Sequence, residues 1–384
     1  MPASLPTPGA EAAQHSAQLA GLIRRDIAAQ GGWIPFSRFM ELALYAPGLG
    51  YYTAGARKFG AAGDFITAPE LSPLFGRAVA HQAAEIMRAS APHILELGAG
   101  SGKLAADMLG ELERLGELPE SYSILEVSAD LRERQQALLQ ERLPHLAGRM
   151  HWLDALPEKI SGAVIGNEVL DALPVHLVRW FGDNILERGV ALEGERFVWQ
   201  ERVLAESALL DIASSIGVPD GYLSEISLAA RGLVASLCER LDAGALLFID
   251  YGFGAPEYYH PQRSEGTLMC HYRHRAHDDP FYLPGLQDIT AHVDFTAIAE
   301  AAIDHGAHLL GYTSQAHFLI NNGLADLMNE VSPENVRAYL PLSAQMQKLT
   351  SPAEMGDLFK AIALGKGMQA PLRGFVSGDR SRML

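Results

Sequence analysis

The chain has 384 residues, of which 48% are hydrophobic and 20% are charged, so it is long enough and apolar enough to bury a large core. Its formal net charge of -16 repels phosphate backbones, which argues against a nucleic acid as the main partner. The two cysteines, Cys238 and Cys270, are too few for a disulfide framework, and no stretch approaches the roughly 18 apolar residues that a membrane span needs.

The first ninety residues are expected to form helices and loops. Apolar spacing predicts helices over Ala12 to Gln30, Pro35 to Leu44 and Leu74 to Arg88. Between the last two lies segment 48–76, which is rich in glycine and aromatic residues and too irregular for a strand. Loops of this length are usually functional or disordered, and the aromatic residues favour a functional loop.

From His93 onward, short apolar strands alternate with amphipathic helices, which is typical of a parallel sheet buried on both faces. The first half of this region is expected to contain strands at 93–97, 122–127, 149–153 and 163–166, and helices at 103–115 and 131–142. The second half is expected to contain an antiparallel meander at 175–204, a helix at 225–241, a buried strand at 245–250, a loop-rich insertion from 251 to about 292, a helix at 295–303 and strands at 308–312 and 358–364.

A glycine-rich loop lies between the strand at 93–97 and the helix at 103–115, and three kinds of nucleotide site compete for it. A phosphate-binding P-loop requires G-x-x-x-x-G-K-[ST]. Counting back from Gly102, Leu97 stands where the first glycine of that motif belongs, and Leu104 stands in place of the serine or threonine. The sequence therefore argues against a P-loop.

A dinucleotide-binding fingerprint, G-x-G-x-x-G, would place its third glycine at position 103, which is Lys103. The spacing of Gly98, Gly100 and Gly102 is instead G-x-G-x-G, preceded by Glu96, and it resembles motif I of class I methyltransferases. Their cofactor has no phosphate, so Glu96 does no electrostatic harm there. We predict that these four residues bind S-adenosylmethionine.

Two further strand ends supply candidate cofactor residues. Glu126 lies one βα unit after the glycine loop, where a carboxylate can bind both ribose hydroxyls, and Val127 follows it. Asp154 and Ala155 follow the third strand and are expected beside the adenine, with Asp154 accepting a hydrogen bond from the exocyclic amine. Because that strand is weak, a turn or helix-capping role for Asp154 is the alternative.

The fourth strand is followed by Asn167, Glu168 and Asp171, at the edge of the sheet that faces the ligand in open parallel sheets. These residues can orient a nucleophile toward the sulfonium methyl, since positioning supplies much of the rate of an in-line displacement. The alternative is that the two acids cap the following segment. His292 is a further catalytic candidate, although a structural histidine is the alternative, and we expect no metal site.

Many segments of the chain match one family. The chain resembles the MidA-like methyltransferases, which include the mitochondrial arginine methyltransferase that assists the assembly of respiratory complex I. The departures are mild, because none removes a carboxylate or a glycine. The matching segments are 48–52, 63–70, 96–102, 125–128, Asn167-Glu168, 171–176, 249–252, 266–268, Asp279-Pro280, Pro284-Gly285, 288–295, Met355-Gly356 and Phe359-Lys360.

The resemblance implies an α/β fold with a Rossmann-like, seven-stranded sheet whose last strand is antiparallel. It implies S-adenosyl-L-methionine as methyl donor, S-adenosyl-L-homocysteine as product and a protein arginine as acceptor. We expect a helical N-terminal region over 1–90 and a methyltransferase core over 91–384. Insertions at about 172–243 and 252–292 are expected to form a substrate cap. Segment 48–76 is expected to close over the cofactor as a lid that includes Gly63, Asp64 and Thr67.

Glu168 is the first choice for binding a guanidinium, followed by Asp171 and His292. The expected partner is a protein that presents an arginine, with a respiratory-complex subunit as the candidate. The first residues carry neither a basic run nor an apolar segment, so we expect no transit or signal peptide and a cytoplasmic location. Two other functions stay open: a catalytically inactive cofactor-binding assembly factor and a nicotinamide-dependent oxidoreductase.

Overall fold

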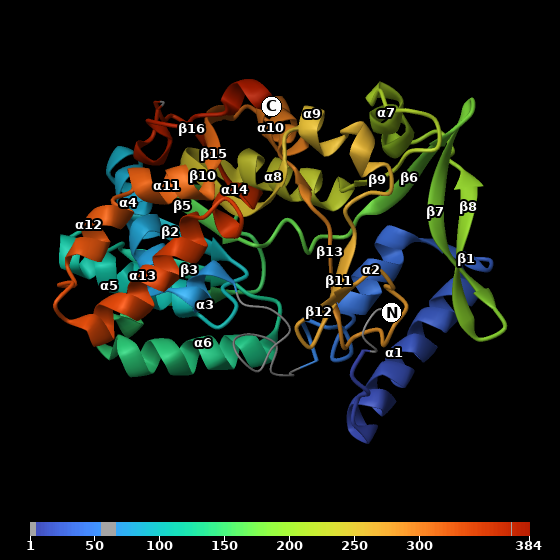
Figure 1. The fold of residues 1–384 in the computed structure, drawn as a ribbon, viewed down its shortest axis with the longest axis horizontal. Coiled ribbons are helices and arrows are strands. Elements are labelled where there is room, and N and C mark those ends of the chain that lie inside the picture. Colours follow the sequence, from blue (N-terminus) through green and yellow to red (C-terminus); the bar gives the residue numbers. More distant parts are fainter. Residues whose placement is uncertain (1–4, 55–66, 370) are drawn as a thin grey trace. The chain divides into compact units, whose positions relative to one another are not determined.

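The computed structural model describes residues 5–54, 67–369 and 371–384 (Figure 1). Within these ranges no helix is both long enough and apolar enough to cross a membrane. The chain divides into two compact units, and each is described by itself. Unit 1 comprises Met1–Phe65, Asp171–Gly232 and Pro256–His292, and unit 2 comprises Ile66–Leu170, Leu233–Ala255 and Val293–Leu384.

Unit 2 is built on one large sheet with the strand order β15-β16-β10-β5-β2-β3-β4. The five strands from β10 to β4 are parallel, whereas β16 is antiparallel to both of its neighbours. This topology confirms the predicted seven-stranded sheet, and a short eighth strand, β14 (Val293–Asp294), pairs with the end of β10. The seven strands are β2 (His93–Leu97), β3 (Ser121–Leu125), β4 (Met150–Leu153), β5 (Ile160–Asn167), β10 (Leu241–Phe253), β15 (His308–Ser314) and β16 (Phe359–Lys366).

Two of the helices beside the parallel strands begin at a serine cap. The Ser72 hydroxyl accepts a hydrogen bond from the backbone N–H of Leu74 and caps α4, and the Ser128 hydroxyl accepts one from Leu131 and caps α6. The helices of the region are α3 (Ala68–Leu71), α4 (Pro73–Ala89), α5 (Lys103–Leu115), α6 (Ala129–Arg142), η2 (Pro144–Arg149), α10 (Phe295–Asp304), α11 (Gln315–Asn321), α12 (Leu324–Asn329), α13 (Val336–Thr350), α14 (Met355–Leu358), η4 (Arg373–Phe375) and η5 (Ser381–Met383), with α8 (Leu228–Arg240) and α9 (Ala255–Tyr258) crossing the boundaries between the units.

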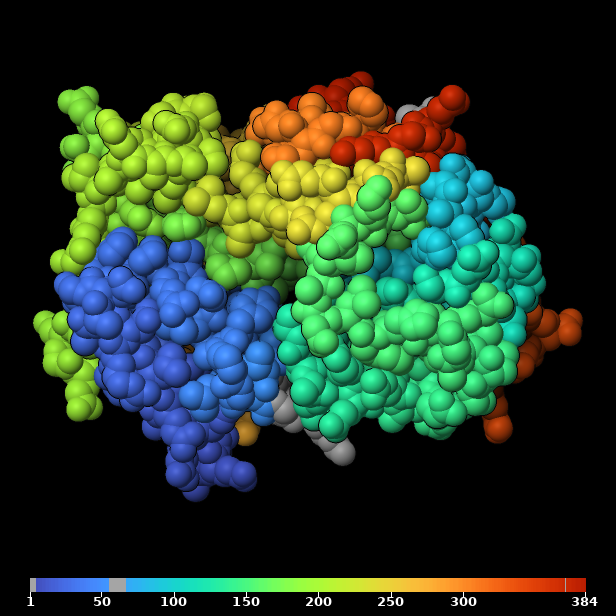
Figure 2. Space-filling view, turned by 180° about the vertical axis from the view of Figure 1, so that it is seen from behind, coloured from blue at the N-terminus to red at the C-terminus, as the bar shows by residue number. Residues whose placement is uncertain are grey.

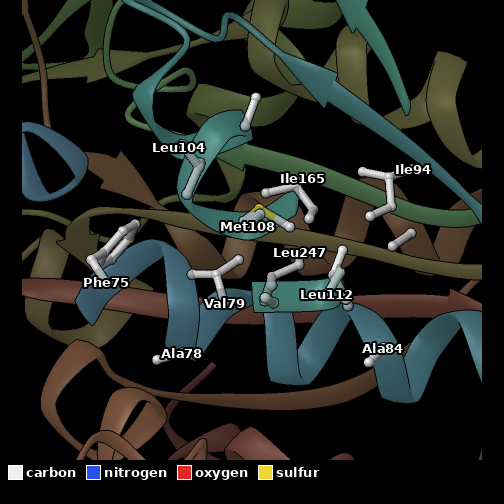
Figure 3. Close-up of a cluster of buried hydrophobic side chains, with 14 of the residues drawn as sticks. Phe75, Ala78, Val79, Ala84, Ile94, Leu104, Met108, Leu112, Ile165 and Leu247 are labelled. Atoms are coloured by element: carbon white, nitrogen blue, oxygen red, sulfur yellow. The ribbon is translucent and has the colours of Figure 1, made fainter. Parts of the chain in front are cut away.

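The core of unit 2 lies where α4 and α5 pack together against the sheet (Figure 3). Phe75 and Val79 of α4, Met108 of α5 and Ile165 of β5 belong to one buried cluster. These side chains are fully buried, and burying each is worth roughly 1.5–3 kcal/mol. The same cluster contains Ile94 of β2, so the helix that follows the glycine loop is anchored in the core beside the strand that precedes the loop.

Unit 1 has its own sheets and its own core. The predicted meander is present as β6, β7 and β8, and β1 and β9 extend it. A second sheet has the order β12-β11-β13, and the core contains Phe36 and Phe39 of α2. The elements of unit 1 are α1 (Ala10–Ala29), β1 (Trp33–Pro35), α2 (Phe36–Tyr45), β6 (His176–Phe181), β7 (Asn184–Glu193), β8 (Arg196–Val203), α7 (Ala208–Ser215), β9 (Leu223–Ile226), η3 (Pro261–Arg263), β11 (Met269–Tyr272), β12 (Arg275–His277) and β13 (Asp288–Thr290).

Some local expectations were wrong. The helix predicted at 225–241 begins only at Leu228, because Leu223–Ile226 pairs with β6 as β9. The Glu225 carboxylate accepts hydrogen bonds from the backbone of Thr267 and Leu268, which a helix start would not place there. The insertion expected to be loop-rich contains the three strands β11–β13, and the helices between 315 and 350 were not predicted.

Candidate active site

The glycine loop joins β2 directly to α5 in unit 2. Gly98, Gly100 and Gly102 have φ values of 60°, 55° and 84°, a left-handed backbone that side chains disfavour. A Cβ atom at Gly98 would lie 3.4 Å from Cγ2 of Val169, so the loop passes close to the residues that follow β5. The loop backbone can therefore approach a ligand closely. The prediction that this loop lies between a strand and the start of a helix is confirmed.

Glu96 lies inside the sheet layer and its side chain does not face solvent. The residue is 2% exposed, and its carboxylate accepts a hydrogen bond from the Tyr122 hydroxyl at 2.7 Å. Burial raises the pKa of Glu96 to about 7, the hydrogen bond from Tyr122 opposes this shift, and the Glu126 charge adds to it. The Tyr122 hydroxyl thus donates to one of the two carboxylate oxygens of Glu96, the acid that precedes the loop.

Glu126 follows β3 and is held in one orientation. One carboxylate oxygen accepts the backbone N–H of Ser128 at 2.9 Å, and the other accepts the side-chain amide of Gln135 at 2.9 Å. Burial raises the pKa of Glu126, and these two hydrogen bonds oppose the shift. Each carboxylate oxygen has a second acceptor position, so both can also accept from the two hydroxyls of a ribose. Val127 beside it exposes 70% of its surface, and its contact with the cofactor stays a prediction.

The residues after β4 are placed differently from Glu126. The Asp154 side chain is 89% exposed and forms an ion pair with Arg132 at 2.7 Å, and Ala155 is also exposed. The Arg132 guanidinium also donates to the carbonyl oxygens of Glu126 and Leu153, so it ties the ends of β3 and β4 together. The adenine contact of Asp154 stays a prediction, in competition with this ion pair.

Glu168 directly follows β5 and adopts an unusual backbone conformation. Its φ of 51° is in the left-handed region, which is uncommon for residues other than glycine and is often found at functional sites. One carboxylate oxygen accepts hydrogen bonds from the Asn167 side-chain amide at 3.2 Å and from the backbone N–H of Ala68 at 3.4 Å. The structure therefore places this carboxylate at the end of β5, next to the strand that leads into the glycine loop.

Asn167 provides a test of whether this edge fits a ligand. Its Oδ1 atom is buried and has no hydrogen-bond partner among the described residues, while its Nδ2 donates to Glu168. A buried acceptor without a donor is costly, by about 1–3 kcal/mol. A ligand that carries amine or hydroxyl donors, as S-adenosylmethionine does, would remove that cost.

Asp250 was not predicted as a site residue, although it lies in segment 249–252, which matches the family. Asp250 lies on β10, and its carboxylate accepts the backbone N–H groups of Val169 at 3.1 Å and Leu170 at 2.9 Å. It therefore holds the turn that follows Glu168. An acidic residue near the end of a strongly apolar strand was the signal that pointed to it.

Asp171 and His292 belong to unit 1, and their segments lie together there. The backbone N–H of Ala291 donates to the carbonyl oxygen of Asp171 at 3.1 Å, and the backbone N–H of His292 donates to the Thr267 hydroxyl at 3.0 Å. The Asp171 side chain is buried. The catalytic roles of both residues stay predictions.

The predicted lid is described only at its two ends. Gly63 and Asp64 lie outside the described residues, together with the rest of residues 55–66 of this segment. Thr67 immediately precedes α3, and its side chain makes no capping hydrogen bond. Glu70 on α3 accepts a hydrogen bond from Ser101, which attaches this short helix to the glycine loop.

The glycine loop, Glu126 and Asn167 therefore gather at the carboxyl edge of a methyltransferase-type sheet. A family model for S-adenosyl-L-methionine-dependent methyltransferases matches residues 76–313. The chain belongs to this family. Its cofactor is S-adenosyl-L-methionine, as predicted. This cofactor argues against the alternative of a nicotinamide dinucleotide.

The chain is similar to proteins named as arginine methyltransferases, over most of the length of both chains. The zebrafish (Danio rerio) protein arginine methyltransferase NDUFAF7 is 31% identical over 86% of this chain and 82% of its own. The Drosophila melanogaster homologue is 29% identical over 96% of this chain and 90% of its own. Both are named as mitochondrial proteins, as is the human protein, so the predicted cytoplasmic location is contradicted.

A solved structure is similar over the whole chain. A Burkholderia thailandensis protein crystallised with S-adenosyl-homocysteine is 51% identical and covers 99% of this chain and 100% of its own, with a TM-score of 0.96. A second crystal structure from that organism is 50% identical, with the same coverage and a TM-score of 0.94. These similarities support the fold and the cofactor together.

Proposed function

We propose that this methyltransferase transfers a methyl group to a guanidinium nitrogen of an arginine in a partner protein, and that Glu168 binds the guanidinium. The observation that carries the proposal is the Glu168 carboxylate, held in a left-handed backbone conformation at the end of β5. The names of the relatives as protein arginine methyltransferases support the choice of acceptor.

The proposed role of Glu168 follows from the chemistry of the guanidinium group. This group is a permanent cation whose lone pairs are delocalised, so it is a poor nucleophile. A carboxylate that pairs with one edge holds the group in place and concentrates electron density on the remaining nitrogen. S-adenosylmethionine, when bound, supplies an electrophilic methyl on its sulfonium. Asp171 is the second candidate for binding the guanidinium, and His292 is the third.

A Glu168→Gln variant tests this assignment, because glutamine keeps the size and most hydrogen bonds but loses the charge. We expect methyl transfer to fall about 10²-fold or more, with affinity for S-adenosylhomocysteine close to that of the wild type. Single-turnover transfer to an arginine peptide and calorimetric binding are measured on the same samples. The exposed Glu158→Gln serves as control and should change neither quantity.

Two results would overturn this role of Glu168. Full transfer by Glu168→Gln would move the role to Asp171 or His292. Lost affinity for S-adenosylhomocysteine would make Glu168 part of the cofactor site instead.

The acceptor is proposed to be a subunit of a respiratory complex, on the resemblance to the methyltransferases that assist complex I assembly. The net charge of -16 favours a basic segment around the target arginine. Incubation of a lysate with labelled methyl donor, followed by mass spectrometry, tests both points. Label on a carboxyl, a lysine or a small molecule would contradict the arginine assignment.

A further inference from the structure

Helix α6 buries one stripe of side chains, and a glutamine stands in the middle of it. Leu131, Gln135 and Leu139 are buried and lie four residues apart, so they share one face of the helix. The rest of α6 is partly or fully exposed, and Figure 2 shows this part of the chain at the molecular surface, coloured teal to green. Another leucine would suit the buried stripe, whereas a buried amide costs free energy unless it is hydrogen-bonded.

Both polar atoms of the Gln135 side chain are used, and they reach three different segments. The amide nitrogen donates to the carbonyl oxygen of Gly100 at 2.9 Å and to the carboxylate of Glu126 at 2.9 Å. The amide oxygen accepts the indole N–H of Trp152 on β4 at 3.0 Å. One side chain thus joins the glycine loop, the acid after β3 and the third strand of the site.

The loop is shaped to let this side chain approach. A Cβ atom at Gly102 would lie 3.2 Å from the Cα and Cγ atoms of Gln135, which is closer than most real contacts. Glycine at this position therefore serves the approach of α6 as well as the left-handed turn into α5. The glycine loop and Gln135 form one packed arrangement.

We infer that Gln135 is a positioning residue for the cofactor: its amide fixes the Gly100 carbonyl and orients the Glu126 carboxylate toward the ribose. The inference rests on the proposed assignment of Gly100 and Glu126 to the cofactor site. The same amide hydrogen bond opposes the effect of burial on the pKa of Glu126, so it helps to keep this carboxylate charged. The other charged groups that face Glu126 are Arg132 on α6 and Glu96 on β2.

A Gln135→Met variant keeps the length of the side chain but makes none of its three hydrogen bonds. We expect its affinity for S-adenosylhomocysteine to fall about tenfold or more, as for loss of a hydrogen bond to a charged group. The loss should grow as pH falls from 8.5 to 5.5, because Glu126 without its amide donor takes up a proton more readily. The dissociation constant is measured by calorimetry across this range, well below the melting temperature of each variant.

Gln135→Glu gives a second, independent readout. The carboxyl group that this substitution introduces has a single O–H, so when it is protonated it can donate to Glu126 but not also to the Gly100 carbonyl, whereas two charged carboxylates repel. Affinity should therefore be highest at pH 5.5 and fall steeply toward pH 8.5, opposite to the trend of Gln135→Met. A role of Gln135 in stability alone would not produce opposite pH profiles.

Gln82→Met is the matched control. Gln82 is also fully buried, on α4, where it accepts the backbone N–H of Gly374 at 2.8 Å and donates to Glu85 at 2.8 Å. Its loss should lower the melting temperature and leave the affinity within about twofold of the wild type, since it contacts no candidate cofactor residue. Equal loss of affinity in Gln82→Met and Gln135→Met would overturn the inference, as would wild-type affinity of Gln135→Met at every pH.

Two variants separate this inference from the site assignment on which it rests. If Glu126→Ala and Gly100→Val bind S-adenosylhomocysteine as tightly as the wild type, the cofactor site itself is misassigned. If both lose affinity while Gln135→Met keeps it, the site is right and the positioning role of Gln135 is wrong.

Discussion

Glu96 couples the stability of unit 2 to pH through a single buried carboxyl group. Its pKa is raised by burial to about 7 from an ordinary value of 4.5, so the folded protein holds this proton more tightly than the unfolded chain does. The stability that the proton contributes is complete below about pH 4.5 and is lost as pH rises through 7. The folded protein therefore carries a buried charge at pH 8 that it does not carry at pH 5.

Glu96→Gln should remove this pH dependence, because the glutamine side chain accepts the Tyr122 hydrogen bond without a charge. Relative to the wild type, the free energy of unfolding of the variant should rise between pH 5 and pH 8, by about 3 kcal/mol at most. Urea unfolding at each pH measures it, with Glu158→Gln as an exposed control. A difference from the wild type that stays constant with pH would contradict the buried-carboxyl account.

At the scale of elements, the turn after β5 depends on a neighbouring strand. The backbone N–H of Glu168 donates to the Ile249 carbonyl at 2.9 Å, and Asp250 accepts the N–H groups of Val169 and Leu170. Strand β10 thus holds a left-handed residue in a conformation that costs of order 1–3 kcal/mol by itself. The turn therefore fixes the orientation of the Glu168 carboxylate.

Asp250→Asn should disturb the orientation of Glu168 without removing it. One carboxylate oxygen of Asp250 accepts the N–H groups of Val169 and Leu170 and the other accepts the N–H of Tyr251, so the amide nitrogen of an asparagine would have to face one of these donors. We expect methyl transfer to slow by about tenfold or more, since misplacement of a reacting group by about 1 Å costs up to about 10²-fold. Affinity for S-adenosylhomocysteine should change far less. Asp242→Asn, on the same strand but exposed, is the control. Normal turnover in Asp250→Asn would show that the turn is held by its other contacts.

At the scale of the whole molecule, each of the two units has its own buried core. The core of unit 1 includes Phe39, and that of unit 2 includes Phe75, both fully buried. Apart from Gly63 and Asp64, which lie outside the described ranges, the candidate cofactor residues belong to unit 2, whereas Asp171 and His292 belong to unit 1. Glu168, the first candidate for binding the guanidinium, also belongs to unit 2. Damage to the core of unit 1 is therefore expected to leave cofactor binding intact.

Phe39→Ala and Phe75→Ala form a matched pair that tests this division. Each should cost about 3–5 kcal/mol of stability, as for other buried phenylalanines. At a temperature where both variants are folded, Phe39→Ala should keep the wild-type affinity for S-adenosylhomocysteine and Phe75→Ala should lose affinity, because Phe75 packs beneath α5. Calorimetry measures the affinity for S-adenosylhomocysteine, and circular dichroism checks that each variant is folded. An equal loss of affinity in both variants would contradict the assignment of the cofactor to unit 2.

The sequence by itself determined those parts of this protein whose structure depends on signals in neighbouring residues. The strand His93–Leu97, the glycine loop and the helix Lys103–Leu115 were predicted with their observed limits, because apolar runs, glycines and capping signals are local. The cofactor followed from the spacing of three glycines and one acid, and the family from motifs along the chain.

Only the tertiary structure decided which distant residues support these motifs. Glu225 and Ile226, predicted as the start of a helix, belong instead to strand β9 because this segment pairs with β6. Gln135 looked like one polar residue in a charged helix, and Asp250 looked like the end of a buried strand. Their roles arise from hydrogen bonds to residues 35 and 80 positions away in the chain, which no local pattern records. The physical reason is that a buried polar group must find a partner, and the fold alone determines which partner lies within reach.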